Sequence, residues 1–275
     1  MKKTSRIITV IIFIFLYLPI LLLVIASFNS GTDLAVFRSF TFAQYGEFFK
    51  DSDLVRLAFN SLVIAFLSTV IATVTGTCAA IGIYSMNGRL RALIMGITNI
   101  PLTNPDIVTG VSLALVFVFA GSLLKINSIL GFWTLLIAHI TFNMPYVIMN
   151  VIPRLHSMDE KLTEAAMDLG CTGIQAFFRV TIHQIMPGII AGALMSFTMS
   201  LDDFVISYFV TGSDFVTLPV EIYNYTKKPI HPKLYALFVM MFVVILILMI
   251  FMNIIQSRAD RGKVHSADSS PGGYA

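Results

Sequence analysis

The chain has 275 residues, of which 57% are hydrophobic and only 12% are charged. Soluble domains carry roughly a quarter charged residues, so a water-soluble fold could not hide this much apolar surface, and lipid must be its solvent. The net charge of +3 is too small to indicate a nucleic-acid partner, and the basic residues are spread among the predicted loops.

Six stretches are apolar enough to cross a bilayer, which takes about 20 residues at a rise of about 1.5 Å each. In chain order they are residues 7–28, 57–84, 92–120, 132–152, 188–210 and 234–256. Pro101 and Pro105 interrupt the third stretch and Pro145 the fourth, which spanning helices tolerate where neighbouring groups satisfy the freed carbonyls. The sequence therefore predicts an all-α integral membrane protein, with one transmembrane domain over residues 1–256 and a disordered tail over residues 257–275.

The first stretch follows three bases, Lys2, Lys3 and Arg6, which is also the order of a cleaved signal peptide. Its 22 residues exceed the usual apolar region of a signal peptide, and Ala26-Ser27-Phe28 is a poor cleavage site, so we favour an uncleaved first span. With the N-terminus inside, eleven Lys and Arg residues fall on the cytoplasmic side and seven outside. This bias predicts that both termini are cytoplasmic.

The longest predicted cytoplasmic segment, residues 154–187, begins with the signals of a short helix. Ser157 and Glu160 fit a capping box, and Gly170 is placed to end the helix that this box starts. One apolar face at i, i+3, i+4 and i+7 is formed by Leu162, Ala165, Ala166 and Leu169.

A second short helix is predicted after it, since Thr172 and Gln175 can cap one, and Pro187 then precedes the fifth span. Small residues on the first helix would let the surface of another protein approach closely, as when a helix docks into a groove. The alternative is an amphipathic segment lying on lipid, which the few bases and several acids of this segment disfavour.

The segment resembles the EAA motif of ABC importer permeases, through Glu164-Ala165-Ala166, Gly170, Ile182 and Pro187. Met186 stands where the family has Leu. The number of spans, the loop sizes and the orientation agree with that family too. The resemblance implies the type I importer permease fold in a bacterial cytoplasmic membrane, with this segment as a coupling helix in a cleft of an ATPase. The residues expected to contact the ATPase are then Glu164, Ala165, Ala166 and Gly170.

Three carboxylates, those of Asp106, Asp202 and Asp203, lie within the predicted spans, where charges are costly and usually functional. No base lies in those spans to neutralise them, which indicates a pathway for a cationic substrate. Adjacent helix residues point about 100° apart, so Asp202 and Asp203 cannot both face one narrow lumen. The structural alternative is an aspartate that caps a broken helix or bonds across helices, and Asn104-Pro105-Asp106 has the pattern of such a break.

Three blocks resemble the second permease subunit of spermidine/putrescine importers. They are residues 105–108, residues 131–133 with 139–142, and residues 200–205 with 209–212. This resemblance implies a polyamine substrate, which is multiply charged and apolar between its charges. Carboxylates and aromatic faces suit such a cation, so Tyr208 and Trp133 join the acids as candidate pathway residues. Rings of this kind more often pack against lipid, and Trp133 has the position of an interface anchor.

The remaining polar residues of the spans indicate structure more than chemistry. His139 and Asn143 lie one turn apart on the fourth stretch, where an interhelical hydrogen bond is favoured over a proton relay. Neither Cys78 nor Cys171 has a CxxC neighbour or a nearby pair of histidines, so no metal or redox site is predicted.

A phosphate loop of the form G-x-x-x-x-G-K-[ST] is absent, so the chain is predicted to be a non-catalytic subunit that binds no cofactor. The family resemblance implies ATP and Mg²⁺ on an ATPase homodimer, a homologous permease subunit, and an outside polyamine-binding protein that meets residues 29–56 and 211–233. A proton-driven secondary transporter is the alternative, although the inverted repeats common in that class are not seen. An intramembrane enzyme is disfavoured, because H-E-x-x-H and Gly-x-Ser-x-Gly are absent.

Overall fold

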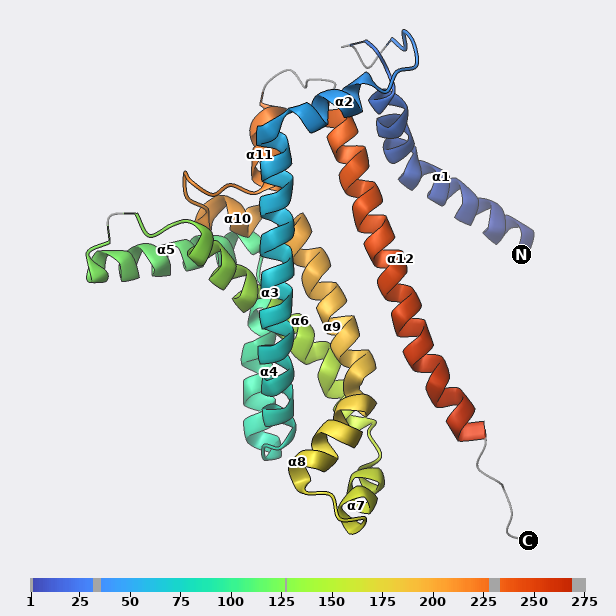
Figure 1. The fold of residues 1–275 in the computed structure, drawn as a ribbon, viewed down its shortest axis with the longest axis vertical. Coiled ribbons are helices and arrows are strands. Elements are labelled where there is room, and N and C mark those ends of the chain that lie inside the picture. The colour runs from blue at the N-terminus through green and yellow to red at the C-terminus, as the bar shows by residue number, and fades with distance from the viewer. Residues whose placement is uncertain (1, 32–35, 127, 228–232, 269–275) are drawn as a thin grey trace. The chain divides into compact units, whose positions relative to one another are not determined.

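The computed structural model describes residues 2–31, 36–126, 128–227 and 233–268, and within these ranges the fold is helical (Figure 1). The helices in chain order are α1 (Lys2–Ser27), α2 (Ala43–Lys50), α3 (Ser52–Tyr84), α4 (Gly88–Thr103), α5 (Asp106–Leu124), α6 (Phe132–His156), α7 (Glu160–Asp168), α8 (Gly173–Ala176), the π-helix η1 (Phe177–Thr181), α9 (Ile182–Asp202), α10 (Val205–Val210), α11 (Leu218–Thr226) and α12 (Lys233–Asp268). The all-α prediction is confirmed.

Among the described residues, six helical runs are long and apolar enough to cross a membrane. They are Arg6–Ser27, Ser52–Tyr84, Asp106–Leu124, Phe132–His156, Gly173–Asp202 and Leu234–Phe251. This number confirms the prediction of six spans. Each span differs from its predicted range in at least one bound, and the third and fifth differ by more than ten residues at their starts.

The third predicted span, residues 92–120, is wrong as a single helix. Helix α4 ends at Thr103, and Asn104 has an extended backbone with φ −78° and ψ 145°. The ring of Pro105 disfavours a helical conformation for the residue before it, so the chain must leave the helix at Asn104. Asp106 then opens α5, where its carboxylate favours the helix dipole. Figure 1 shows α5 running across the direction of α4, and α5 alone is the candidate span.

The fifth predicted span, residues 188–210, both begins and ends earlier in the structure. Helices α8, η1 and α9 form one run of 30 residues, Gly173–Asp202, so Pro187 lies inside a helix and not before it. The run stops at Asp203, whose backbone is extended with φ −66° and ψ 118°. No Pro or Gly marks this stop in the sequence, which is why the prediction ran through it.

The predicted disordered tail, residues 257–275, begins too early, because α12 continues to Asp268. Helix growth is cooperative, so a long apolar helix extends into polar residues until a breaker intervenes. Residues 269–275 lie outside the described residues.

The chain forms two compact units, Met1–Ala58 with Glu221–Leu248, and Phe59–Val220 with Met249–Ala275. In the first unit, the most apolar window of α1 buries none of its residues against this chain, which leaves that helix to lipid or to another subunit. The single domain over residues 1–256 stays a prediction.

Helix α6 forms the centre of the second unit, and its fully buried side chains include Leu135, Val147 and Val151. It packs against α9, where glycines let the two backbones approach. A β-carbon added to Gly192 would lie 2.9 Å from Cα of Val147, so only a residue without a side chain fits there. Close approach through small residues is the usual way in which membrane helices associate.

The end of α3 is capped by Arg91 from the following helix. Its guanidinium donates from Nε to the carbonyl oxygen of Ile83 at 3.3 Å and from Nη2 to that of Met86 at 3.2 Å, and Nη2 also donates to the carbonyl of Tyr84. The guanidinium carbon lies 5.4 Å from the centre of the Tyr84 ring. The carbonyls of Ile83 and Tyr84 belong to the last turn of α3, where that of Ile83 also accepts from the N–H of Met86 at 3.2 Å, and a cation at this end complements the helix dipole.

Arg91→Ala should therefore lower the free energy of unfolding by about 2 kcal/mol, the usual value of hydrogen bonds to a charged donor. Thermal unfolding of the detergent-solubilised protein measures the change. Arg89→Ala is the matched control, because Arg89 is exposed on the same helix and should leave the midpoint unchanged. Equal midpoints for the two variants would contradict the capping role.

Candidate functional site

The predicted coupling helix is present as α7, but it starts differently from the prediction. Asp159, not Ser157, is the capping residue, and its Oδ1 accepts a hydrogen bond from the N–H of Lys161 at 3.1 Å. Ser157 instead ends α6, where its hydroxyl donates to the carbonyl oxygen of Arg154 at 3.2 Å. The prediction of a Ser157–Glu160 capping box is therefore wrong, because α6 extends to His156 and Ser157 is its C-cap residue.

Gly170 ends α7 as predicted. It has a positive φ of 89°, which favours glycine, and its N–H donates to the carbonyl oxygen of Met167 at 2.9 Å. The N–H of Cys171 donates to the carbonyl oxygen of Ala166 at 3.1 Å, which completes a Schellman turn. The chain thus reverses sharply directly after α7.

The predicted apolar face of α7 is largely uncovered in this chain. Leu162 is 52% exposed and Leu169 is 88% exposed, and Glu164 and Ala165 are also exposed, while Ala166 is half-buried. Apolar side chains this accessible on a short polar-flanked helix are typical of a surface that another protein covers. The contact of Glu164, Ala165, Ala166 and Gly170 with an ATPase stays a prediction.

Two features attach α7 to the spanning helix α9. The capping box of Thr172 and Gln175 is confirmed: the Thr172 N–H donates to Gln175 Oε1 at 3.1 Å and the Gln175 N–H donates to Thr172 Oγ1 at 3.4 Å. It starts the run that continues through η1 into α9. In addition, Oε1 of Gln184 on α9 accepts from the N–H of Asp159 at 3.1 Å, which fixes the start of α7 to α9.

The carboxylates that the sequence singled out lie at two breaks in the helices of the second unit. Asp106 is exposed at the first residue of α5. Asp202 is exposed at the last residue of α9, and no hydrogen bond or ion pair to it occurs among the described residues. Asp203 follows directly in the link to α10, but its side chain is only 7% exposed.

The Asp203 carboxylate caps α10. Its Oδ1 accepts from the N–H of Ile206 at 3.1 Å, and its Oδ2 accepts from the N–H of Ser207 at 2.7 Å and from the Ser207 hydroxyl at 2.8 Å. Phe204 between the two helices already has helical angles, φ −103° and ψ −42°. Asp203 thus fills the role of the capping residue, which supplies an acceptor to the first N–H groups of a helix.

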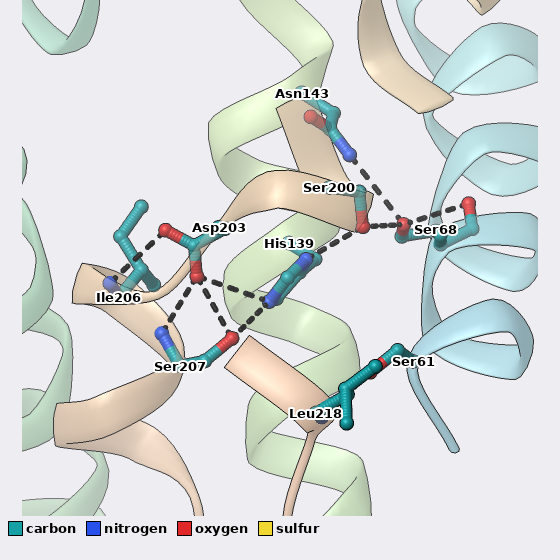
Figure 2. Close-up of polar contacts among 10 residues, drawn as sticks. Ser61, Ser68, His139, Asn143, Ser200, Asp203, Ile206, Ser207 and Leu218 are labelled. Carbon is teal, nitrogen blue, oxygen red and sulfur yellow. Dashed lines mark hydrogen bonds and ion pairs between the residues drawn. The ribbon is translucent and has the colours of Figure 1, made fainter. Parts of the chain in front are cut away.

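His139 joins this link to the centre of the bundle (Figure 2). Its ring is 2% exposed, with Nδ1 2.7 Å from Oγ of Ser200 and Nε2 3.0 Å from Oγ of Ser207. Nε2 also lies 3.5 Å from Oδ2 of Asp203. The interhelical hydrogen bond that the sequence favoured for His139 is confirmed, and Asn143 makes another by donating from Nδ2 to Ser68 Oγ at 3.4 Å.

Sequence reasoning missed the serines of this network. Ser68 on α3 and Ser200 on α9 are buried with their hydroxyl oxygens 3.0 Å apart, and Ser207 is completely buried on α10. Each is a small polar residue in an apolar stretch, a common pattern for interhelical bonding, but nothing local in the sequence says which partner it meets.

The aromatic candidates lie apart from one another in the chain. Trp133 is 71% exposed at the second residue of α6, as expected of an interface anchor. Tyr208 is 43% exposed on α10, and its ring centre lies 5.5 Å from that of Phe204. Tyr208 and Phe204 are therefore placed close to the break at Asp203.

A cavity of about 490 Å³ opens between the end of α5 and the residues that follow α10. Its polar lining comes from Ser122, Ser128, Thr211 and Ser213, and none of the predicted pathway residues lines it. Within the described ranges, no three His, Cys, Asp or Glu side chains gather closely enough to hold a metal ion. Cys78 and Cys171 are free thiols.

Comparison with known proteins gives a family for this arrangement. The family described as "Binding-protein-dependent transport system inner membrane component" matches residues 72–262. The chain is 35% identical over 245 residues to the spermidine/putrescine transport system permease protein PotC of Haemophilus influenzae, covering 89% of this chain and 93% of that one. It is 38% identical over 227 residues to the putrescine transport system permease protein PotI of Escherichia coli K12, covering 82% and 80%.

Two solved structures share the fold. A chain of a bacterial ABC transporter that imports the acidic polysaccharide alginate matches with a TM-score of 0.72 at 17% identity, covering 93% of this chain and 95% of that one. A chain of the inward-facing MetNI methionine ABC transporter matches with a TM-score of 0.58 at 19% identity, covering 76% and 95%. This likeness confirms the fold that the sequence predicted, that of type I ABC importer permeases.

Proposed function

Because the chain belongs to the family of binding-protein-dependent transport system inner membrane components, we propose that it is the permease subunit of an ATP-driven importer that brings spermidine or putrescine into the bacterial cytoplasm. The observation that carries the proposal is the similarity to permeases named for these substrates, which extends over at least 82% of the chain. The subunit itself is non-catalytic and forms the translocation path with a homologous permease.

The chemistry of the break between α9 and α10 supports a cationic substrate. Asp202 presents a carboxylate there, and Tyr208 presents an aromatic face within six residues of it in the chain. A primary ammonium group pairs with a carboxylate and is attracted to an aromatic ring. The methylene segments of a polyamine pack well against the apolar side chains that surround such a break.

Helix α7 supports the coupling to an ATPase. Its exposed apolar and small residues fit a groove on a partner, and a homodimeric ATPase holding ATP and Mg²⁺ would supply the energy. Closure of that dimer would favour one orientation of the bundle over the other through the contacts of α7, which is a shift between two populated states. The orientation requires α7 and both termini to be cytoplasmic, and a polyamine-binding protein then meets the outside segments 29–56 and 211–233.

Uptake of radiolabelled putrescine and spermidine by cells that lack this chain, with and without a plasmid that restores it, tests the proposal. Restored uptake, together with an ATPase that co-purifies with the solubilised permease, is the expected result. Purified chain that transports in response to a pH gradient without an ATPase would establish the secondary-transporter alternative instead.

Replacing Asp202 and Asp203 together with Asn should reduce polyamine uptake by about tenfold, because hydrogen bonds to a charged group are lost from the path. The loss should appear at equal amounts of protein in the membrane, measured by immunoblotting. Asp260→Asn, in the part of α12 beyond its candidate span Leu234–Phe251, is the matched control and should transport normally. Full uptake by the double variant would contradict a role of these aspartates in the substrate pathway.

A further inference from the structure

The two adjacent aspartates at the end of α9 have opposite surroundings. The Asp203 carboxylate accepts three hydrogen bonds from α10 and lies beside a buried histidine ring. A carboxylate offers about four acceptor positions, so little of this one is left for a ligand. Asp202 is exposed and has no hydrogen bond or ion pair among the described residues.

The hydrogen-bond directions show how His139 holds Asp203. The Ser207 hydroxyl gives its one hydrogen to Asp203, so its oxygen must accept from Nε2–H of His139. In the neutral ring Nδ1 then accepts from the Ser200 hydroxyl. The ring therefore ties the last turn of α9 at Ser200 to the first turn of α10 at Ser207, one on each side of the break (Figure 2).

The same network reaches two further helices. His139 belongs to α6, and Ser200 contacts Ser68 of α3 at 3.0 Å. Asn143, one turn along α6 from His139, donates to Ser68 as well. Four helices thus meet through side chains that are almost completely buried, and each of these side chains makes at least one hydrogen bond in the network, although Oδ1 of Asn143 has no partner among the described residues. Buried hydrogen bonds are strong in a medium of low dielectric constant and help to fix one geometry.

We propose that Asp203 and His139 are positioning residues, which hold the break between α9 and α10 in the geometry that presents Asp202 to the substrate, and that Asp203 is not itself a substrate ligand. This division of roles rests on the proposed function for its substrate. The cap on α10, however, requires an acceptor at position 203 and does not require a charge.

Five neutral variants of the complete transporter, three at position 203 and two at position 202, separate the two roles, measured as polyamine uptake at saturating substrate and equal membrane levels. Asp203→Ser and Asp203→Asn keep a capping acceptor, so their uptake should stay within about twofold of the parent, while Asp203→Ala should lose about fivefold. Asp202→Asn and Asp202→Ser should both lose about tenfold, because no conservative polar group replaces a carboxylate that meets a cation. Equal losses for all three variants at position 203 would make Asp203 a ligand and overturn the proposal.

The shared role of the pair has its own test in the same assay. The double variant His139→Ala with Asp203→Ala should lose no more polyamine uptake than the poorer single variant, since both substitutions disrupt the same hydrogen-bond network. Losses that multiply would show two independent roles and would also overturn the proposal.

A third measurement does not depend on the substrate. Ile206 is completely buried on α10, so Ile206→Cys, with Cys78 and Cys171 replaced by Ser, should be unreactive toward a thiol reagent in membranes. Adding Asp203→Ala should make the thiol reactive, and adding Asp203→Ser should not. The expected result does not depend on which substrate the transporter moves. An unreactive thiol in the Asp203→Ala variant would contradict the positioning role of Asp203 and would leave the proposed function untouched.

Discussion

Glu164→Lys should abolish polyamine uptake while the protein still inserts into the membrane. Glu164 is exposed on α7 next to Ala165, and no described contact of the bundle depends on it. A reversed charge at the centre of a docked helix places like charges together or leaves a buried charge unpaired, which weakens association by about a hundredfold. The permease would then be left without its energy source.

Co-purification of the ATPase with the tagged permease measures this loss directly, and uptake measures its consequence. Glu47→Lys is the matched control, because Glu47 is also an exposed glutamate on a short helix, α2, outside the coupling segment. It should retain the ATPase fully. Normal polyamine uptake by the Glu164→Lys variant would contradict the proposed coupling role of α7.

Gly192→Leu should prevent α6 and α9 from packing and should have the largest effect on stability. A β-carbon at this position would meet the backbone of Val147 at 2.9 Å, and a backbone cannot rotate away as a flexible side chain does. Overpacking of this kind costs about 3 kcal/mol even before the rest of the leucine is placed. Because the polar network of His139 also spans these two helices, uptake should fall together with stability.

The thermal midpoint of the detergent-solubilised complex is the measurement. Gly82→Leu in α3 is the control, since no atom lies within 4 Å of a β-carbon added there, and removal of a helical glycine should leave the midpoint unchanged or higher. An unchanged midpoint for Gly192→Leu would mean that the α6–α9 contact is not a close one.

The sequence predicted the spans and the coupling helix because their signals are local. Apolar length identifies a span, and Gly170 ends α7 through a backbone conformation that glycine adopts easily. The capping residue was misassigned because Ser157 and Asp159 are both competent caps, and the choice depends on how far α6 extends. Local patterns rarely decide between two such residues.

The hydrogen-bond network around His139 could not be predicted from local sequence patterns, because its members are far apart in the chain. Ser200 meets His139 across 61 residues of sequence and Ser68 across 132. The sequence correctly offered a capping aspartate as an alternative to a pathway role, but it could not assign that role to one of two adjacent carboxylates. The assignment needs the stop of α9 at Asp202, which only the folded chain reveals.

The helical run Gly173–Asp202, 30 residues long and made of α8, the π-helix η1 and α9, has a mechanical consequence. At a rise of about 1.5 Å per residue it measures about 45 Å. Gly188 stands near its middle, 15 residues from one end and 14 from the other, and a β-carbon added to Gly188 would lie 2.6 Å from the carbonyl oxygen of Asn150 on α6. If the run pivots there as one body, it is a lever with equal arms, so a displacement of its Gly173 end swings Asp202 the opposite way by a similar distance.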